Sequence, residues 1–282
     1  MTQKKALVIQ DISAIGRVSM MVALPILVSA GINVSCLPTA LLSTHSGEFR
    51  DFSFLDLTEE MEKIITHWKS VDIRFDAVQT GYLGSHDQIE AVKRAMTMAK
   101  EDALRIVDPV MADNGKLYSG ISHAMVDAMR DLCGCASILL PNLTEANLLI
   151  EEPYRDGHND IGYVQEILHK LYDRLKVPKI VLTGVSSKAG HYGAVCFDGD
   201  TKSIDYFERK KIEDHFYGTG DIFASVLSAS LLNQKTLQES TDIAVDFTQR
   251  TITMSKDLGG ERRMGVCFEK NIPWLIHRLG LI

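Results

Sequence analysis

Short apolar runs that look like strands alternate with longer segments of helical periodicity along most of this 282-residue chain. Four of the runs are ALVI, RIV, SILL and KIVL, and each is continuously apolar, as expected for strands buried on both faces of a parallel sheet. Parallel strands that are separated by helices are joined by right-handed crossovers. The alternation therefore predicts an α/β protein with a mainly parallel central sheet and helices on both faces.

Four segments add detail to this pattern. Residues Gly16–Ala30 have helical periodicity, and His191–Phe197 with Ser203–Glu208 indicate an antiparallel strand pair. The stretch Ser43–Leu55 is polar, rich in aromatic residues and too short for a helix plus a strand, so we expect a small flap over a site, with a plain surface connection as the alternative. There is no internal repeat or low-complexity linker, and we expect one domain over residues 1–282.

Composition and charge exclude several classes of protein. Hydrophobic residues make up 45% of the chain and charged residues 24%, the balance of an ordinary globular protein. A net charge of -7 gives no basic footprint for nucleic acid or an anionic membrane. No apolar run reaches the roughly 18 residues of a membrane span, and the first residues lack the apolar core of a signal peptide. We expect a cytoplasmic protein whose five scattered cysteines are apolar fillers.

Polar residues follow the apolar runs at the points where the strands should end. In an open α/β sheet, ligands bind beyond the carboxyl ends of the strands. Any one of these residues could be an ordinary loop residue, because Pro, Asn, Gly and Asp are common in loops. Their recurrence along one predicted edge favours a binding site there; the residues are Gln10–Asp11, Thr80–Tyr82, Asp108–Val110, Pro141–Asn142 and Thr183–Gly184.

A glycine-flanked turn introduces the helical stretch near the C-terminal third. The segment His215–Leu232 reads HFYGTGDIFASVLSASLL, so GTGD stands directly before an apolar helix. The first amides of a helix have no partner within it, glycine allows a ligand to approach the backbone, and the helix dipole favours an anion. Asp221 in such a cradle could accept a proton from a substrate hydroxyl group while the amides bind a phosphoryl group. The turn alone also permits an ordinary acidic residue in the first turn.

Other known phosphate-binding motifs are absent from the sequence. There is no G-x-x-x-x-G-K-[ST] for a P-loop and no G-x-G-x-x-G after the first strand. A nucleophile elbow, G-x-S-x-G, and the metalloprotease motif H-E-x-x-H are absent too. The GTGD turn is therefore the strongest candidate anion site in the sequence.

Five motifs in their order and spacing resemble the pyridoxal kinases of the ribokinase-like superfamily. The resemblance implies a ribokinase-like three-layer α/β sandwich with a small flap, and it runs from the first strand to the helix after GTGD. It also implies a small-molecule kinase that transfers a phosphoryl group from ATP to the hydroxymethyl group of a B6 vitamer, with Mg²⁺ and possibly a monovalent cation. The motifs are QDISAIGRVSMMVALPIL near the start, TGYLGS (80–85), DPVMADNGKLY (108–118), PNLTEANLL (141–149) and YGTGDIFAS (217–225).

The GTGD turn takes a catalytic role by this resemblance. Asp221 matches the base that deprotonates the hydroxymethyl group. Gly218, Thr219 and Gly220 match the anion hole around the γ-phosphate. In hydroxymethylpyrimidine kinases, and in the pyridoxal kinases derived from them, this turn typically reads GTGC, so the aspartate favours the conventional pyridoxal kinase branch.

The nucleotide and metal side of the site is also implied by the resemblance. Glu145 matches an acidic residue that organises Mg²⁺ and its waters, and Asn142 opens the same motif. Asp108 and Asp113 match carboxylates near the nucleotide and the cation, so Asp108 and Glu145 are the candidate metal residues. Thr183 matches a hydroxyl group near the nucleotide phosphates. Such a set suits Mg²⁺, which prefers one or two carboxylates together with phosphates and water.

The substrate side departs from the family pattern at one position. Asp11, Ser46 and Tyr82 fall at positions that contact the pyridine ring in the family, and Tyr82 could instead be a core aromatic residue. The usual family start is Gln-Ser-His, whereas this chain has Gln10-Asp11-Ile12. A carboxylate would pair more tightly with a protonated ring or amine than a hydroxyl group does, which leaves the preferred vitamer open.

Two other functions compete with B6 vitamer phosphorylation. The nearer one is a hydroxymethylpyrimidine kinase of thiamin synthesis, and the more distant one is a non-catalytic pyridoxal phosphate-binding protein. The second would be expected to lose Asp221 or the glycines, and this chain retains them. The resemblance also implies a homodimer that binds small molecules only.

Overall fold

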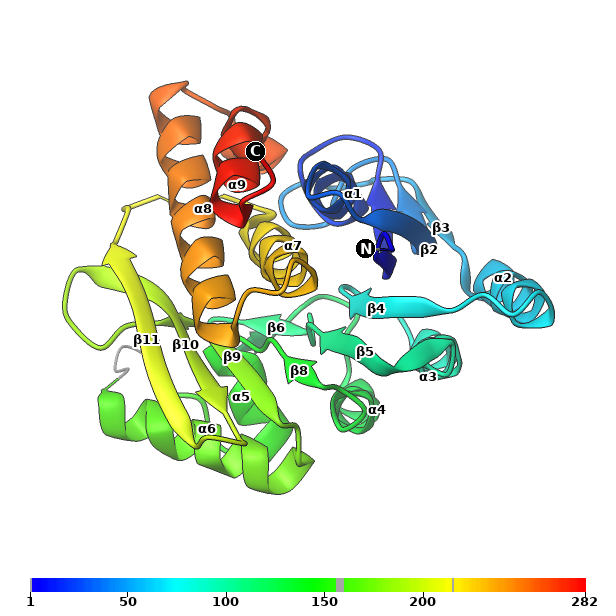
Figure 1. Cartoon of the computed structure of the whole chain (residues 1–282), viewed down its shortest axis with the longest axis horizontal. Coiled ribbons are helices and arrows are strands. Elements are labelled where there is room, and N and C mark those ends of the chain that lie inside the picture. The colour runs from blue at the N-terminus through cyan, green and yellow to red at the C-terminus, as the bar shows by residue number, and fades with distance from the viewer. Residues whose placement is uncertain (1, 156–159, 215) are drawn as a thin grey trace.

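The computed structural model describes residues 2–155, 160–214 and 216–282, and it confirms the predicted α/β architecture (Figure 1). Within these residues a nine-stranded sheet has the order β11-β10-β9-β8-β5-β4-β1-β2-β3. The pairs β2–β3, β9–β10 and β10–β11 are antiparallel, and the other neighbouring pairs are parallel. The strands are β1 (Lys5–Ser13), β2 (Asn33–Leu42), β3 (Phe54–Asp56), β4 (Phe75–Thr80), β5 (Ala99–Val107), β8 (Ile138–Leu139), β9 (Lys179–Val185), β10 (His191–Asp198) and β11 (Ser203–Lys210), with β6 (Ala112–Asp113) and β7 (Lys116–Leu117) as a separate hairpin.

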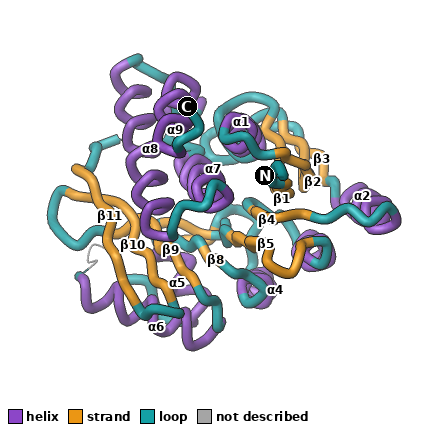
Figure 2. The backbone as a smooth tube through the Cα atoms, viewed as in Figure 1, coloured by secondary structure: helices purple, strands orange, loops and turns teal. Residues whose placement is uncertain are grey.

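Helices cover both faces of the sheet and give three layers (Figures 1 and 2). Alternate residues of β1 show why two cores form: Leu7 and Ile9 pack in one core, whereas Ala6 and Val8 pack in the other, as the period of two along a strand requires. The first core lies under α2 (Thr58–Ser70), α3 (His86–Met96), α4 (His123–Cys133), α5 (Leu143–Ile150) and α6 (Ile161–Leu175). The second lies under α1 (Met20–Ser29), α7 (Thr219–Leu232), α8 (Leu237–Asp257) and α9 (Ile272–Leu279), which follows the 3₁₀ turns η1 (Arg262–Met264) and η2 (Glu269–Asn271).

The order of the strands determines where a ligand can bind. The chain passes from β1 to β2 on one side of β1, and β4 then returns to its other side. This reversal of strand order is a topological switch point, and ligands bind at the carboxyl ends of the strands beside it. The predicted site residues, which lie in or just after the carboxyl ends of β1, β4, β5, β8 and β9, are therefore brought to one edge of the sheet.

Two predicted boundaries differ from the structure. The helix expected at Gly16–Ala30 begins only at Met20, because Gly16 and Ser19 have φ angles of 110° and 50°, which an α-helix excludes. The flap expected at Ser43–Leu55 is a loop that ends at Ser53, since Phe54 and Leu55 pair with Leu42 and Leu41 in the short antiparallel strand β3. Residues 16–19 and the loop both lie next to the site described below.

Each helix of the described chain is too short or too polar to span a bilayer.

Candidate active site

The GTGD turn forms the amino end of α7. Gly218 is the N-cap residue and has a φ of 78°, a conformation that glycine adopts without strain. A Cβ at Gly218 would overlap the carbonyl oxygen of Arg17, whereas a Cβ at Gly220 would have no atom within 4 Å. The first helical hydrogen bond of α7 runs from the amide of Ile222 to the carbonyl of Gly218 at 3.0 Å. In the described chain the preceding amides, those of 219–221, are thus available to an anion. His215, the first residue of the predicted segment, lies outside the described residues.

Asp221 is the first acidic residue of α7 and is held by one hydrogen bond. Its Oδ2 accepts a bond from the amide of Ser19 at 2.8 Å, while Oδ1 has no hydrogen-bond donor within the described part of the protein. Burial raises the pKa of Asp221 to about 7; the Ser19 hydrogen bond opposes this rise and the charge of Asp11 adds to it. A carboxylate of this pKa can accept a proton near neutral pH.

Asp11 lies at the end of β1, close to Asp221 and deeply buried. Its Oδ1 accepts a hydrogen bond from the hydroxyl group of Ser19 at 2.6 Å, and its Oδ2 accepts one from Ser13 at 3.2 Å. Burial raises the pKa of Asp11 although both hydroxyl groups and the nearby His45 lower it. Burial and the charge of Asp11 also raise the pKa of Tyr82, which places the phenol near this carboxylate.

Ser46, the third predicted substrate residue, is exposed on the loop between β2 and β3, and among the described residues its side chain forms no hydrogen bond with Asp11 or Tyr82. The neighbouring His45 attaches the loop to the rest of the site. Its Nε2 lies 2.5 Å from the carbonyl oxygen of Arg263, its Nδ1 accepts a bond from the amide of Gly47 at 3.1 Å, and its ring lies 4.7 Å from that of Tyr217. The loop is thereby fixed next to the residue that precedes GTGD.

Glu145 lies in the first turn of α5 and closes a capping box. Its amide donates to Oδ1 of Asn142 at 3.0 Å, and its Oε2 accepts from the amide of Asn142 at 2.9 Å. Its Oε1 accepts from the amide of Met111 at 3.1 Å. Burial raises the pKa of Glu145 to about 8 against the effect of these backbone hydrogen bonds, and the charge of Asp113 adds to the rise. The capping role explains the position of Glu145, but among the described residues this acid forms no ion pair.

Asp108 follows β5 and faces the same group of carboxylates. Burial, then the charge of Glu145 and then that of Asp221, raise the pKa of Asp108 well above its usual value. Asp113, on the hairpin after it, accepts a hydrogen bond from the amide of Asn114 at 2.9 Å. The structure therefore brings Asp108, from the predicted edge of the sheet, together with Glu145 and Asp221.

Thr183 lies on β9 beside the start of α5. Its amide donates to the carbonyl of Pro141 at 2.9 Å, and it forms an isolated parallel bridge with Asn142. Its half-buried hydroxyl group lies 3.4 Å from the same carbonyl. The sequence prediction that Thr183 and Asn142 share the site edge agrees with this arrangement.

A magnesium ion would need ligands beyond the protein at this site. The described residues include no group of three or more His, Cys, Asp or Glu side chains arranged to hold a metal ion. Asp108 has no hydrogen bond in the described chain, whereas both oxygens of Glu145 accept backbone hydrogen bonds. This fits Mg²⁺, which is usually held by one or two carboxylates, phosphate oxygens and water.

Sequence reasoning missed two residues of the site, Ser19 and Tyr118. Ser19 was assigned to a helix, so its contacts with both aspartates could not be anticipated. The pKa of Tyr118 is raised by burial and then by the charges of Glu145, Asp113, Asp108 and Asp221 in decreasing order, so the phenol faces the carboxylate cluster. Its place in the DPVMADNGKLY motif was the available signal.

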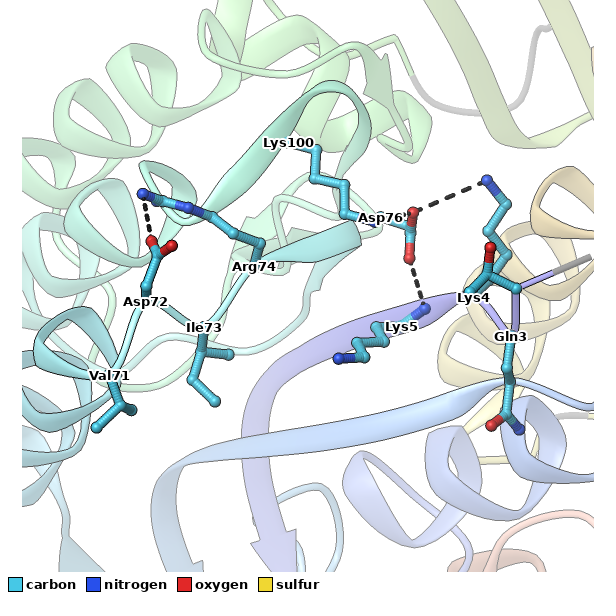
Figure 3. Close-up of a pocket in the computed structure, with 10 residues that line it drawn as sticks. Gln3, Lys4, Lys5, Val71, Asp72, Ile73, Arg74, Asp76 and Lys100 are labelled. Carbon is cyan, nitrogen blue, oxygen red and sulfur yellow. Dashed lines mark hydrogen bonds and ion pairs between the residues drawn. The ribbon is translucent and has the colours of Figure 1, made fainter.

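A cavity of the described chain lies away from this site, at the amino ends of β1 and β4. It has a volume of about 460 Å³ and is lined by residues 2–5, 71–74, Asp76 and Lys100. Figure 3 shows Asp76 facing Lys4 and the start of β1. Its acidic side chains already pair with Lys4, Lys100 and Arg74, and no predicted site residue lines it.

Comparison with known proteins identifies the family. The sequence profile described as phosphomethylpyrimidine kinase matches residues 37–265. A crystal structure from Bacteroides thetaiotaomicron, named "putative phosphomethylpyrimidine kinase" and containing pyridoxal, is 36% identical, covers 97% of this chain and 96% of its own, and has a TM-score of 0.90. Pyridoxal kinase from Lactobacillus plantarum is 29% identical with 98% of both chains covered and a TM-score of 0.91.

A third solved structure contains a nucleotide. Pyridoxal kinase from Leishmania donovani in complex with ADP and pyridoxamine is 25% identical, covers 98% of this chain and 96% of its own, and has a TM-score of 0.83. These likenesses confirm the ribokinase-like fold and a kinase that acts on a small molecule. The chain belongs to the phosphomethylpyrimidine kinase family, as a pyridoxal kinase-type member of the ribokinase-like superfamily.

Proposed function

We propose that this protein uses ATP to phosphorylate the 5′-hydroxymethyl group of a B6 vitamer (pyridoxal, pyridoxine or pyridoxamine), in the salvage of pyridoxal 5′-phosphate. The observation that carries the proposal is the amino end of α7, where amides without a partner among the described residues adjoin Asp221, whose Oδ1 has no donor there either. Relatives named as pyridoxal kinases, with ADP and pyridoxamine or with pyridoxal, support the substrate class.

The chemistry follows from these groups. Asp221 accepts the proton of the hydroxymethyl group through Oδ1, while its Oδ2 stays bound to the amide of Ser19. The alcohol oxygen attacks the γ-phosphorus of ATP and the bond to the β-phosphate oxygen breaks, giving the vitamer 5′-phosphate and ADP. The amides of 219–221, at the start of α7, stabilise charge on the transferred group. Since the transition state of such transfers is loose, positioning contributes more than deprotonation.

Acidic and polar residues would hold the nucleotide and its metal. We assign Asp108 and Glu145 to a Mg²⁺ ion. Asp108 would be a direct ligand, whereas Glu145 would act through water, because both oxygens of Glu145 already accept backbone hydrogen bonds. When bound, Mg²⁺ would neutralise phosphate charge. Asn142, Asp113 and Thr183 would line the nucleotide phosphates. A monovalent cation is compatible with the surplus of negative charge.

The vitamer ring would lie between β1, β4 and the loop after β2. Asp11 would accept a hydrogen bond from a protonated ring nitrogen, an amine or a hydroxyl group, with Tyr82 beside it. Ser46 would reach the ring from the loop, which His45 fixes near GTGD. Held in this place, the loop would shield the bound substrate from water and so limit ATP hydrolysis.

Assembly and location complete the proposal. We infer a cytoplasmic homodimer in which residues 1–282 form one kinase domain. Leu41, Phe54 and Leu55 are 43%, 49% and 55% exposed at the β2–β3 edge, and such apolar side chains at a sheet edge favour pairing with a second copy. Light scattering of the purified protein tests the dimer, and a monomer at all concentrations would contradict it.

A substrate panel tests the proposed reaction. Pyridoxal, pyridoxine, pyridoxamine and hydroxymethylpyrimidine are each supplied with ATP and Mg²⁺, and the product is identified by mass. We expect phosphorylated B6 vitamers as the best products and no product when a chelator removes Mg²⁺. Preferred phosphorylation of hydroxymethylpyrimidine, which the matching family profile keeps as the second candidate, would overturn the proposal.

A further inference from the structure

Ser19 connects the two aspartates of the site. Its amide donates a hydrogen bond of 2.8 Å to Oδ2 of Asp221, and its hydroxyl group donates one of 2.6 Å to Oδ1 of Asp11. Both Ser19 and Asp11 are buried, with 9% and 5% of their surface exposed. One residue therefore fixes the orientation of a carboxylate on α7 and of another on β1, which are 210 positions apart in the sequence.

The backbone of Ser19 adopts a conformation that serine rarely takes. Its φ and ψ are 50° and -132°, and such positions cost roughly 1–3 kcal/mol unless the surroundings compensate. Ser19 is also the N-cap of α1, where a serine normally accepts a hydrogen bond from the first turn, yet its side chain makes no such bond. The hydroxyl group is used as a donor to Asp11 instead, so its local capping role is given up.

Neighbouring backbone holds the segment before Ser19 on two sides. The amide of Arg17 donates to the carbonyl of Met264 at 2.9 Å, and Arg17 forms a bridge with Gly265. On the other side the turn at Gly218 touches the carbonyl of Arg17 so closely that a Cβ there would overlap it. This packing of Arg17 and the hydrogen bond from the Ser19 hydroxyl group to Asp11 together keep the amide of Ser19 directed at Asp221.

We propose that Ser19 is a positioning residue that sets the distance and orientation between the acid that binds the substrate ring and the acid that activates its hydroxyl group. Its amide occupies Oδ2 of Asp221 and leaves Oδ1 for the substrate, and its hydroxyl group orients Asp11 toward a donor on the ring. The inference rests on the proposed function. It defines the substrate as a heteroaromatic alcohol with a hydrogen-bond donor held by Asp11 and a CH₂OH group held by Asp221.

The variant Ser19→Gly isolates the hydroxyl group, because glycine keeps the amide and accepts a positive φ. We expect the KM for the vitamer to rise about tenfold, the effect of losing a hydrogen bond to a charged group, with kcat and the KM for ATP nearly unchanged. Ser13→Ala is the comparison variant, because it removes the longer bond of 3.2 Å to Asp11 and leaves Ser19 in place, so the vitamer KM should rise less than in Ser19→Gly. An unchanged vitamer KM in Ser19→Gly would overturn the proposal.

A double-mutant cycle with Asp11→Ala tests whether the two residues act together. Coupled residues give combined effects that differ from the product of the single effects. We expect Ser19→Gly to have little further effect on the vitamer KM once Asp11 is removed. Effects that multiply would show that the hydroxyl group acts independently of Asp11 and would refute this part. Activity of the wild-type protein in the substrate panel separates this outcome from a failure of the proposed function.

The variant Ser19→Ala tests the amide. For alanine, as for serine, a φ of 50° is unfavourable, and alanine lacks the hydroxyl hydrogen bond to Asp11 that compensates for it. The backbone should therefore relax to another conformation, and the amide of residue 19 should move away from Asp221. We expect kcat to be about tenfold lower in Ser19→Ala than in Ser19→Gly, with melting temperatures recorded for both. Equal kcat values in the two folded variants would contradict a role of the amide in positioning Asp221.

Discussion

The acidic residues at the two edges of the central sheet have opposite electrostatic surroundings. At the amino edge, Asp76 accepts hydrogen bonds of 2.8 Å from Nζ of Lys100 and from the amide of Lys5. Burial alone would raise its pKa, but these bonds and the charges of Lys100 and Lys4 lower it overall. At the carboxyl edge, Asp108 and Asp221 form no ion pair within the described chain, and their pKa values are raised.

This difference separates a stabilising arrangement from a functional one. Acids that have cationic partners lower the free energy of the folded state, whereas buried acids that lack them raise it. Function is the usual reason for keeping such a cluster. The carboxyl edge is therefore an incomplete electrostatic site that a cation and a substrate would complete, and the amino edge is complete without a ligand.

Replacement of Asp221 tests the difference most severely. Asp221→Asn keeps the shape of the side chain and removes the proton acceptor, so we expect kcat to fall by a factor on the order of 10²–10⁴ with little change in the KM for ATP. Steady-state kinetics on the folded variant measure both quantities. Activity within a few-fold of the wild type would exclude Asp221 as the base.

The pH dependence of kcat/KM is the next largest effect. Asp221 must be ionised to accept a proton, and its pKa is raised from 3.8 to about 7. We therefore expect kcat/KM to fall about tenfold for each pH unit below about 7, whereas a base of ordinary pKa would keep full activity to about pH 5. The residual activity of Asp221→Asn should lack this acidic limb. An identical limb in that variant would assign it to the substrate or to another group.

The variant Gly220→Ala tests whether the γ-phosphate binds at the amino end of α7. Since a Cβ there meets no protein atom within 4 Å, Gly220→Ala should keep or slightly raise the melting temperature. We expect kcat/KM for ATP to fall about tenfold, because the methyl group would occupy the anion hole. Gly218→Ala is the comparison variant and should lose stability through overlap with Arg17. Full activity of Gly220→Ala would argue that the phosphate binds elsewhere.

The smallest expected effects concern stability at the two edges. At pH 8 without Mg²⁺, Asp76→Asn should lower the free energy of unfolding by about 1–2 kcal/mol, and Asp108→Asn should raise it. Because the pKa of Asp76 is lowered in the folded state, its stabilising contribution persists as the pH falls to about 4, the ordinary range of an aspartate. Because the pKa of Asp108 is raised, the destabilisation caused by its buried charge disappears as the pH falls and the group becomes protonated. Urea denaturation at pH 8 and pH 5 measures both, and effects of the same sign would refute the contrast.

Much of the fold could be predicted from local sequence patterns and from the burial of apolar residues. The continuous apolar strands and the helices between them predicted the layers, and the carboxyl ends of the strands, with Asp11 near the end of β1 and Asp108 just after β5, lie on one edge as expected. The conformation of Ser19 could not be predicted, because its positive φ depends on contacts with segments near Gly218 and Gly265 that are distant in sequence. Helical periodicity therefore extended over residues that are not helical.

The site depends on residues 263 and 264. The amide of Arg17 donates a hydrogen bond to the carbonyl oxygen of Met264, and Nε2 of His45 is bound to the carbonyl oxygen of Arg263. During synthesis these acceptors emerge from the ribosome after the GTGD turn and α8. A nascent or truncated chain that ends before residue 263 would contain Asp221 without the contacts that hold the neighbouring segments in place, so competence for the proposed phosphoryl transfer should arise only after residues 263 and 264 have been synthesised.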